Sequence, residues 1–176
     1  MNQYWILVAI LLPMFGGVAV RFLPLKKKQH LYVFLETIVV LTSIIVWSLI
    51  LGGTTDVFHV VHFVNDLSIS FKIDGMTMVF AGLVSFLWPL ATLYAFEYME
   101  HHERRETFFM FYSIAYGVTL GIAFASDMLT MYFFYELLTL STVPLVMHTL
   151  EREAILASRK YLYYSLGGAA FALMGM

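Results

Sequence analysis

The sequence has no cysteine and few charged side chains. Without cysteine, the 176-residue chain forms no disulfide and ligates no metal cluster through thiolates. Asp, Glu, Lys and Arg make up 12% of the residues, whereas a soluble domain has about 25%. The net charge of −2, with no basic domain, argues against nucleic acid as a partner.

Apolar residues are correspondingly abundant, at 61% of the chain with a mean hydropathy of +0.81. Polar loops divide them into six runs: Tyr4–Leu23, Leu31–Leu51, Met76–Met99, Phe108–Ala125, Met128–Leu150 and Tyr161–Met176. A helix that spans the bilayer needs about 20 predominantly apolar residues. We therefore predict an all-α membrane protein of about six transmembrane helices.

The sixth run differs from the others because it has only 16 residues and ends without a polar or aromatic flank. We expect this last helix to be incomplete, with the chain cut off inside it. The alternative is a short natural subunit whose last helix is tilted or half inserted.

The basic residues indicate how the helices are oriented. Alternate loops hold nine of the ten lysines and arginines: Arg21, Lys26, Lys27, Lys28, Arg104, Arg105, Arg152, Arg159 and Lys160. The other loops hold only Lys72. Because cytoplasmic loops carry an excess of Lys and Arg, we predict that the N-terminus lies outside and the Lys26 loop in the cytoplasm.

The loop between the second and third runs has the pattern of a β-hairpin. Val57–Phe63 is β-branched and aromatic, Val64-Asn65-Asp66 is a plausible turn, and apolar and polar residues then alternate up to Asp74. We predict a small extracytoplasmic β-hairpin here. Asp74 and Asp127 are each placed to cap the helix that follows.

Glu136 is the main candidate for chemistry, because it lies inside the fifth run. Counted from Met128, it is about 12 Å from the outer boundary. A carboxylate at that depth costs at least about 2.5 kcal/mol, so it must be protonated, paired or hydrated. It either relays protons or fixes helix packing through a hydrogen bond. The hydroxyls of Thr139, Ser141 and Thr142 either order a water chain or cap carbonyls loosened by Pro144.

Two other ionisable residues could take part. Lys160 begins the sixth run, after the amphipathic stretch Glu151–Arg159, and it either extends to the interface or places a cation at the mouth of the polar path. His148, near the cytoplasmic end of the fifth run, is either an interfacial side chain or a proton-exchange group. We interpret Glu36 and Glu97 as interface residues.

The sequence offers no recognisable cofactor motif. It has no glycine-rich phosphate loop, nucleophile motif or zinc-ligand spacing, and no pair of deep histidines for haem. We therefore predict no cofactor and no metal site, and no redox catalytic site in this chain.

Several motifs resemble the antiporter-like membrane subunits shared by respiratory complex I, membrane-bound hydrogenases and multisubunit sodium/proton antiporters. They are Asp74-Gly75-Met76, Tyr94-Ala95-Phe96-Glu97-Tyr98-Met99, Ser126-Asp127-Met128-Leu129, Phe134-Tyr135-Glu136-Leu137, Ala157-Ser158-Arg159-Lys160-Tyr161 and Ser165-Leu166-Gly167-Gly168. The resemblance covers most of the chain. It implies an N-terminal three-helix region with an external hairpin over residues 1–107, and the truncated start of the proton-translocating domain over residues 108–176.

The resemblance also implies a function. Glu136, and with it Lys160, would belong to a proton-transfer pathway whose partner lysine lies on a later helix. The chain would move protons, or exchange sodium ions for protons, together with other membrane subunits in a bacterial or archaeal inner membrane. The alternative is a non-transporting structural subunit, or an inactive fragment of such a subunit.

Overall fold

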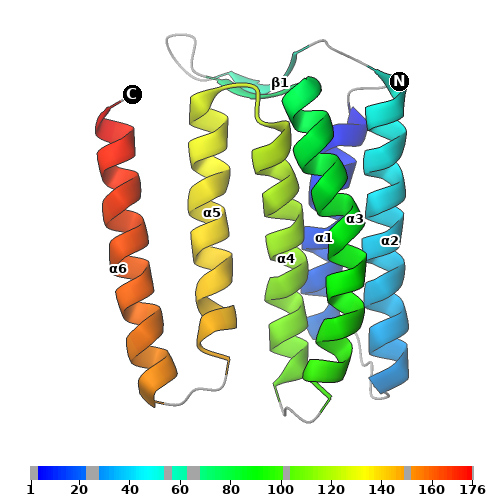
Figure 1. The fold of residues 1–176 in the computed structure, drawn as a ribbon, viewed down its shortest axis with the longest axis vertical. Coiled ribbons are helices and arrows are strands. Elements are labelled where there is room, and N and C mark those ends of the chain that lie inside the picture. Colours follow the sequence, from blue (N-terminus) through cyan, green and yellow to red (C-terminus); the bar gives the residue numbers. More distant parts are fainter. Residues whose placement is uncertain are drawn as a thin grey trace.

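In the described residues, each of the six hydrophobic runs corresponds to a helix, and a β-hairpin lies between the second and third helices (Figure 1). The computed structural model describes residues 4–22, 28–53, 57–62, 68–100, 104–148 and 152–175. In chain order its elements are α1 (Tyr4–Phe22), α2 (Lys28–Gly52), β1 (Phe58–His62), β2 (Ser68–Phe71), α3 (Gly75–Tyr98), α4 (Arg105–Phe124), α5 (Met128–Val146) and α6 (Arg152–Met174). The predicted hairpin between the second and third helices is confirmed. The turn expected at Val64-Asn65-Asp66 lies outside the described residues.

Within the described residues, α1 to α5 are each long and apolar enough to cross a membrane. The multi-pass membrane fold is therefore confirmed. The expected start of the sixth helix near Tyr161 was wrong, because α6 begins at Arg152. The apolar run marks only the part of a helix that suits lipid, and here the first two turns are charged and precede that part.

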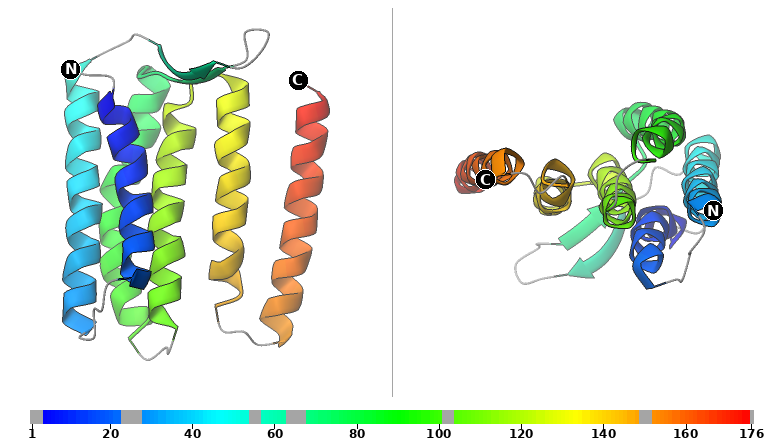
Figure 2. Two further views of the ribbon diagram at one scale, coloured as in Figure 1. Left: turned by 180° about the vertical axis from the view of Figure 1, so that it is seen from behind. Right: turned by 90° about the horizontal axis from the view of Figure 1, so that it is seen from below.

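The helices are arranged as a bundle with an extension. Seen from the end, α1 to α4 cluster together, and α5 and α6 continue outward from α4 in a row (Figure 2). The central helix α4 packs against α1, α3 and α5, and its side chains Phe109, Tyr116, Leu120 and Phe124 are fully buried. Exposed apolar side chains cover the outer surfaces instead, as expected when lipid is the solvent.

Two glycines of α4 allow its neighbours to approach closely. A Cβ atom on Gly117 would overlap the backbone carbonyl of Ile10 in α1, and one on Gly121 would overlap the ring of Phe134 in α5. Small residues at such crossings let membrane helices pack backbone to backbone. The position of α5 against α4 therefore depends on the absence of a side chain at Gly121.

The hairpin lies across one end of the bundle, which we call the hairpin end (Figure 1). Its strands pair antiparallel, with an irregularity between His59 and Val61. Strand β2 also pairs with the α4–α5 connection: the Lys72 amide donates to the Phe124 carbonyl and the Ser126 amide to the Ser70 carbonyl, both at 2.9 Å. The connection between two spans is thus held as part of a small sheet.

Asp127 joins these elements. Its carboxylate accepts bonds of 2.8 Å from both the amide and the hydroxyl of Thr130, and it also accepts the Ser70 hydroxyl. The Ser70 amide in turn donates to the Thr130 hydroxyl at 3.0 Å. The predicted cap of α5 is therefore confirmed, and the same carboxylate also binds β2.

Asp74 caps α3 in the same way, which confirms the second predicted cap. It accepts the Thr77 amide at 2.8 Å and pairs with Lys72 at 2.9 Å. These bonds, led by that from Lys72, lower the pKa of Asp74 from 3.8 to about 2. Burial raises the pKa of Asp127, but the bonds from Ser70 and Thr130 outweigh it and lower the pKa overall. Both carboxylates therefore stabilise the fold above the ordinary aspartate pKa, and this stability is lost as the pH falls through their lowered values.

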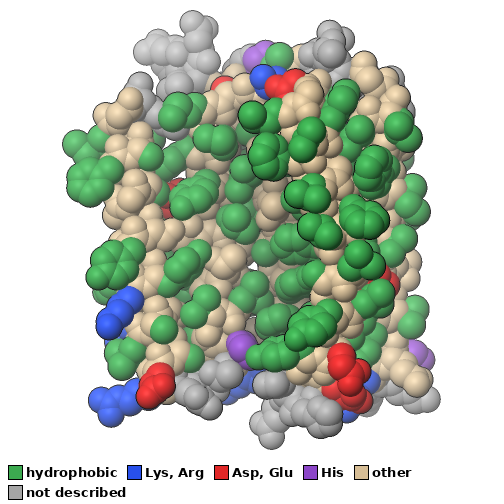
Figure 3. Space-filling view, in the orientation of Figure 1, with side chains coloured by type: hydrophobic (Ala, Val, Ile, Leu, Met, Phe, Trp, Pro, Cys, Tyr) green, Lys and Arg blue, Asp and Glu red, His purple; other side chains and the backbone are tan. Residues whose placement is uncertain are grey.

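Basic side chains gather at the opposite end of the bundle, which we call the basic end. Lys28, Arg105 and Arg152 are the first residues of α2, α4 and α6, whereas Lys72 lies beside the hairpin. In the face shown in Figure 3, hydrophobic side chains cover the middle and charged ones lie mainly toward the two ends. This separation fits the predicted segment count; which end faces the cytoplasm stays a prediction.

Replacing Asp127 with alanine should lower the free energy of unfolding by about 1–2 kcal/mol, because the change removes a helix cap and a bond to β2. Asp74→Ala is the matched control and should cost only about 0.5–1 kcal/mol, since this carboxylate binds only its own helix and Lys72. Thermal unfolding of the purified protein in detergent micelles measures both. Equal losses would contradict a role for Asp127 beyond capping.

Gly117→Ala should destabilise the protein by about 1–3 kcal/mol, because the added methyl group overlaps the backbone of α1. Gly167→Ala in α6 is the control, since a Cβ there meets nothing within 4 Å. This control should be neutral or slightly stabilising, because alanine favours helix more than glycine does. A Gly117→Ala variant as stable as the wild type would show that α1 and α4 can separate without cost.

Candidate functional site

Glu136 lies on α5, eight residues after Met128 and about 12 Å along the helix from its start. The side chain is half-buried, and its Oε1 atom is buried without a hydrogen-bond partner in the part of the chain that the structure describes. Such an unmet acceptor costs about 1–3 kcal/mol. It identifies Glu136 as a group that needs a proton, a water molecule or a partner.

One polar side chain lies near Glu136 on the side of the hairpin end. Tyr132, one turn toward the hairpin end, has its hydroxyl close enough to interact with the Glu136 carboxylate. The two ion pairs within the described ranges join Lys28 to Glu100 and Lys72 to Asp74. Glu136 is therefore left without a cation among these residues.

A row of hydroxyl groups connects α5 to α6 on the other side of Glu136. Thr139 and Ser165 bond through their hydroxyls at 2.9 Å, and Thr142 and Tyr161 do so at 3.0 Å. We call these four residues the hydroxyl row. It begins one turn beyond Glu136 and runs toward the basic end, so this part of the α5–α6 interface is polar.

The hydroxyls of α5 also bond to backbone carbonyls. Ser141 and Thr142 each donate to the Leu138 carbonyl at 2.9 Å, and Thr139 donates to that of Tyr135 at 3.3 Å. Pro144 has no backbone N–H, so the carbonyl of Leu140, four residues earlier, lacks its usual helical donor. None of these hydroxyl bonds reaches the Leu140 carbonyl. Compensation for the proline therefore does not explain these hydroxyls.

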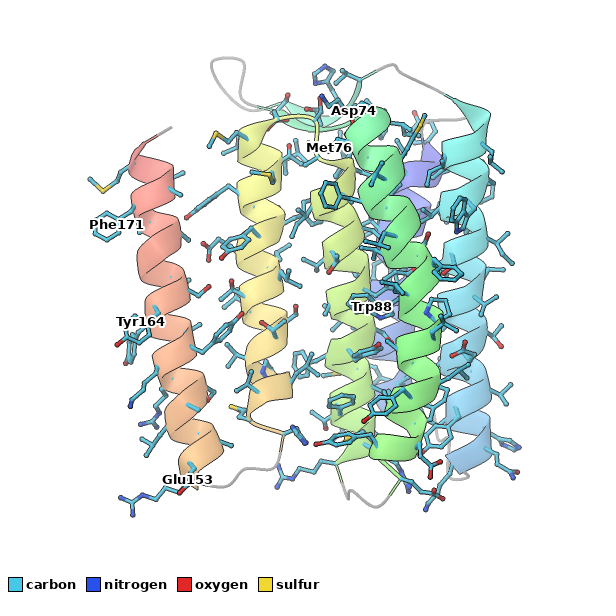
Figure 4. All side chains as sticks on the ribbon, in the orientation of Figure 1. Asp74, Met76, Trp88, Glu153, Tyr164 and Phe171 are labelled. Atoms are coloured by element: carbon cyan, nitrogen blue, oxygen red, sulfur yellow. The ribbon has the colours of Figure 1, made fainter. Side chains whose placement is uncertain are left out.

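Lys160 is exposed on α6 and does not approach Glu136. At 100° per residue, it shares a helix face with Tyr164 and Phe171, which point away from α5 (Figure 4). α5 and α6 run antiparallel, and the two hydroxyl pairs fix their register, so Glu136 is level with residue 168 of α6. Lys160 is eight residues from that level, which places its backbone about 12 Å nearer the basic end. The structure thus places Lys160 and Glu136 apart.

His148 lies at the basic end of α5, twelve residues and about 18 Å from Glu136. Its Nδ1 atom is 2.8 Å from the Leu145 carbonyl, and its ring packs against Tyr98 and Phe108. The three predicted site residues therefore do not form one cluster in this structure.

The sequence did not indicate the partners of the α5 hydroxyls. Tyr161 and Ser165 stand four residues apart, on the α6 face that meets α5. If the sixth helix had been predicted to begin at Arg152, this four-residue spacing would have placed Tyr161 and Ser165 on one face of it. Across the described ranges, the structure groups no three His, Asp or Glu side chains in a way that could hold a metal ion.

Comparisons with known proteins bear on the identity of the chain. Residues 61–109 match the family model for the N-terminus of chain 5 of NADH-ubiquinone oxidoreductase, complex I. The chain is 29% identical over 140 residues to the chloroplastic NAD(P)H-quinone oxidoreductase subunit 5 of Chara vulgaris. It is 25% identical over 176 residues to the A1 subunit of the Na⁺/H⁺ antiporter of Staphylococcus aureus. These alignments cover 75% and 96% of this chain but only 21% and 22% of the relatives.

A solved structure has the same fold. It is the membrane-bound sulfane sulfur reductase, an archaeal respiratory membrane complex, one chain of which matches 97% of this chain with a TM-score of 0.81. The sequence identity is 21%, and 36% of that chain is covered. With the motifs around Asp127 and Glu136, these matches confirm the resemblance predicted from the sequence. The chain is therefore similar to the chain 5 subunits of complex I and to the A1 subunits of sodium/proton antiporters, and it spans about a fifth of the length of these relatives.

Proposed function

We propose that this chain is part of a subunit that carries protons through the membrane along a path containing Glu136. The observation that supports this most strongly is the buried Oε1 atom of a carboxyl group two turns inside a membrane-spanning helix, which has no hydrogen-bond partner among the described residues. The hydroxyl row next to it supplies groups that could hold water between Glu136 and the basic end.

The chemistry proposed for Glu136 is reversible binding of one proton. In lipid, an isolated carboxyl group favours its neutral form, because the charged form loses its hydration. A cation brought within a few ångströms favours the ionised form and drives the proton off. Movement of such a cation would therefore load and unload Glu136. Lys160 and His148 stay candidates for proton exchange at the basic end, away from Glu136 itself.

The partners and the membrane follow from the relatives. Their names describe subunits of a quinone oxidoreductase and of an antiporter, and a respiratory membrane complex, so we propose that this chain works among other membrane subunits. Protons, or sodium ions exchanged for protons, are the proposed cargo. The staphylococcal and archaeal relatives favour a bacterial or archaeal inner membrane.

Glu136→Gln tests the proposal, because glutamine keeps the size and polarity of the side chain but does not release a proton. In the intact complex reconstituted in vesicles, it should lower the initial rate of proton translocation by about 10²-fold, within the range attributed to a positioned acid or base. Glu136→Asp, which keeps a carboxyl group, should retain part of the rate. The pH change inside the vesicles measures both.

Glu153→Gln is the matched control, because Glu153 is exposed at the start of α6 and should not affect transport. Subunit content, measured on the same vesicles, separates a transport defect from an assembly defect. Wild-type translocation by fully assembled Glu136→Gln complexes would overturn the proposal. It would favour a structural role for the subunit.

Thr139→Val tests the hydroxyl row. The change removes the bond to Ser165 while keeping the shape of the side chain, so it should slow proton translocation several-fold and cost about 0.6 kcal/mol of stability. Thr139→Ser restores the hydroxyl and should restore the rate. Thr119→Val on α4 is the control, since that hydroxyl donates only to the Ala115 carbonyl of its own helix. Equal rates in the two valine variants would remove the hydroxyl row from the path.

A further inference from the structure

A second carboxyl group lies inside the membrane-spanning part of the molecule. Glu36 is on α2, eight residues after Lys28 and about 12 Å from the basic end of the helix. The sequence pattern indicates an interface residue, whereas eight residues of α2 precede it and sixteen follow it. The Oε2 atom of Glu36 is buried and has no hydrogen-bond partner among the described residues.

The groups around Glu36 come from three helices. Tyr112 of α4 lies within electrostatic range of the Glu36 carboxylate, and its hydroxyl interacts with Thr92 of α3. The Tyr112 ring packs against that of Trp88 on α3, with centroids 5.2 Å apart. Figure 4 labels Trp88 midway along α3, where this helix faces α4. Glu36 therefore borders a polar interface between α2, α3 and α4.

Two further polar atoms in this interface are buried and unsatisfied. They are the Tyr32 hydroxyl, one turn from Glu36 on α2, and the Nε1 atom of Trp88, neither of which has a partner in the described part of the chain. Both can donate, whereas an ionised carboxylate only accepts. By contrast, the neighbouring Tyr116 hydroxyl is satisfied by Ser43 at 2.9 Å. Both unsatisfied atoms are of kinds that water can bridge.

No charge balances Glu36 within the described residues. The ionisable groups nearest in the helices are Tyr32, one turn away on α2, and Tyr112 on α4, which interacts electrostatically with Glu36; Thr92 is the polar contributor from α3. At the basic end, Lys28 pairs with Glu100 at 4.0 Å, and Arg21 of α1 is exposed. On the outer side, Glu36 lines a largely apolar hollow of about 400 Å³ on the surface of α2.

We propose that Glu36 is a second intramembrane proton-binding carboxyl group, hydrated by water held between it and the side chains of Tyr32, Trp88 and Tyr112. Burial without a cation favours the protonated form, and the water provides the route by which the proton exchanges. The site lies between α2, α3 and α4 and shares no residue with Glu136 or the hydroxyl row. It therefore stands or falls independently of the path proposed above.

Infrared difference spectroscopy of the full protein in lipid vesicles tests this inference, because a protonated carboxyl group has its own C=O stretching band. Wild-type protein should show such a band, which is lost as the pH is raised. The contribution of Glu36 to this band should be lost in Glu36→Gln and kept in Glu136→Gln, which removes only the contribution of Glu136. If Glu36→Gln does not assemble, Glu36→Asp should shift the band instead of removing it.

Tyr112→Phe tests the surroundings of the carboxyl group. Loss of the hydroxyl leaves the ionised form less well solvated, so the pH at which half of the band is lost should rise by about 0.5–1 unit. Tyr163→Phe is the control, because Tyr163 is 74% exposed on α6, and it should leave the midpoint unchanged. If no band distinguishes wild type from Glu36→Gln at any pH, the proposal is overturned. Glu36 is then ionised throughout and paired with a cation from a partner subunit.

Discussion

The bond network at Asp127 is the contact on which the rest of the arrangement depends. One carboxylate caps α5, binds Ser70 of the hairpin and holds Thr130, which accepts the Ser70 amide. The hairpin is also paired with the α4–α5 connection through backbone bonds. The start of α5 is thereby fixed against the bundle, and with it the depth at which Glu136 lies, two turns further along the helix.

Because lipid offers no hydrogen-bond partners, a buried carboxyl group in a membrane-spanning helix is costly and marks a candidate functional site. In water, an unpaired glutamate oxygen is hydrated and costs nothing, whereas in a membrane each unmet polar group is expensive. Glu136 and Glu36 each have one buried carboxyl oxygen without a hydrogen-bond partner among the described residues. They lie on different helices, Glu136 on α5 and Glu36 on α2.

Much of the fold could be predicted from local patterns. The five complete spans, the hairpin and the caps at Asp74 and Asp127 each depend on residues close together in the chain. The start of α6 at Arg152 was missed, because a hydrophobic run shows where lipid is and not where the helical hydrogen bonds begin. Glu36 was placed at an interface, because its depth depends on where α2 starts and ends.

The sequence by itself determined the class of protein, the segregation of basic residues and the presence of a carboxyl group inside the fifth span, because hydropathy and charge are properties of single residues and short windows. Only the tertiary structure decided what these groups meet. It joined Thr139 to Ser165, turned Lys160 to the face of Tyr164, and packed Tyr112 against Trp88. The physical reason is that contacts between helices depend on rotation and register, which the close packing at Gly117 and Gly121 and the network at Asp127 fix across distant parts of the chain.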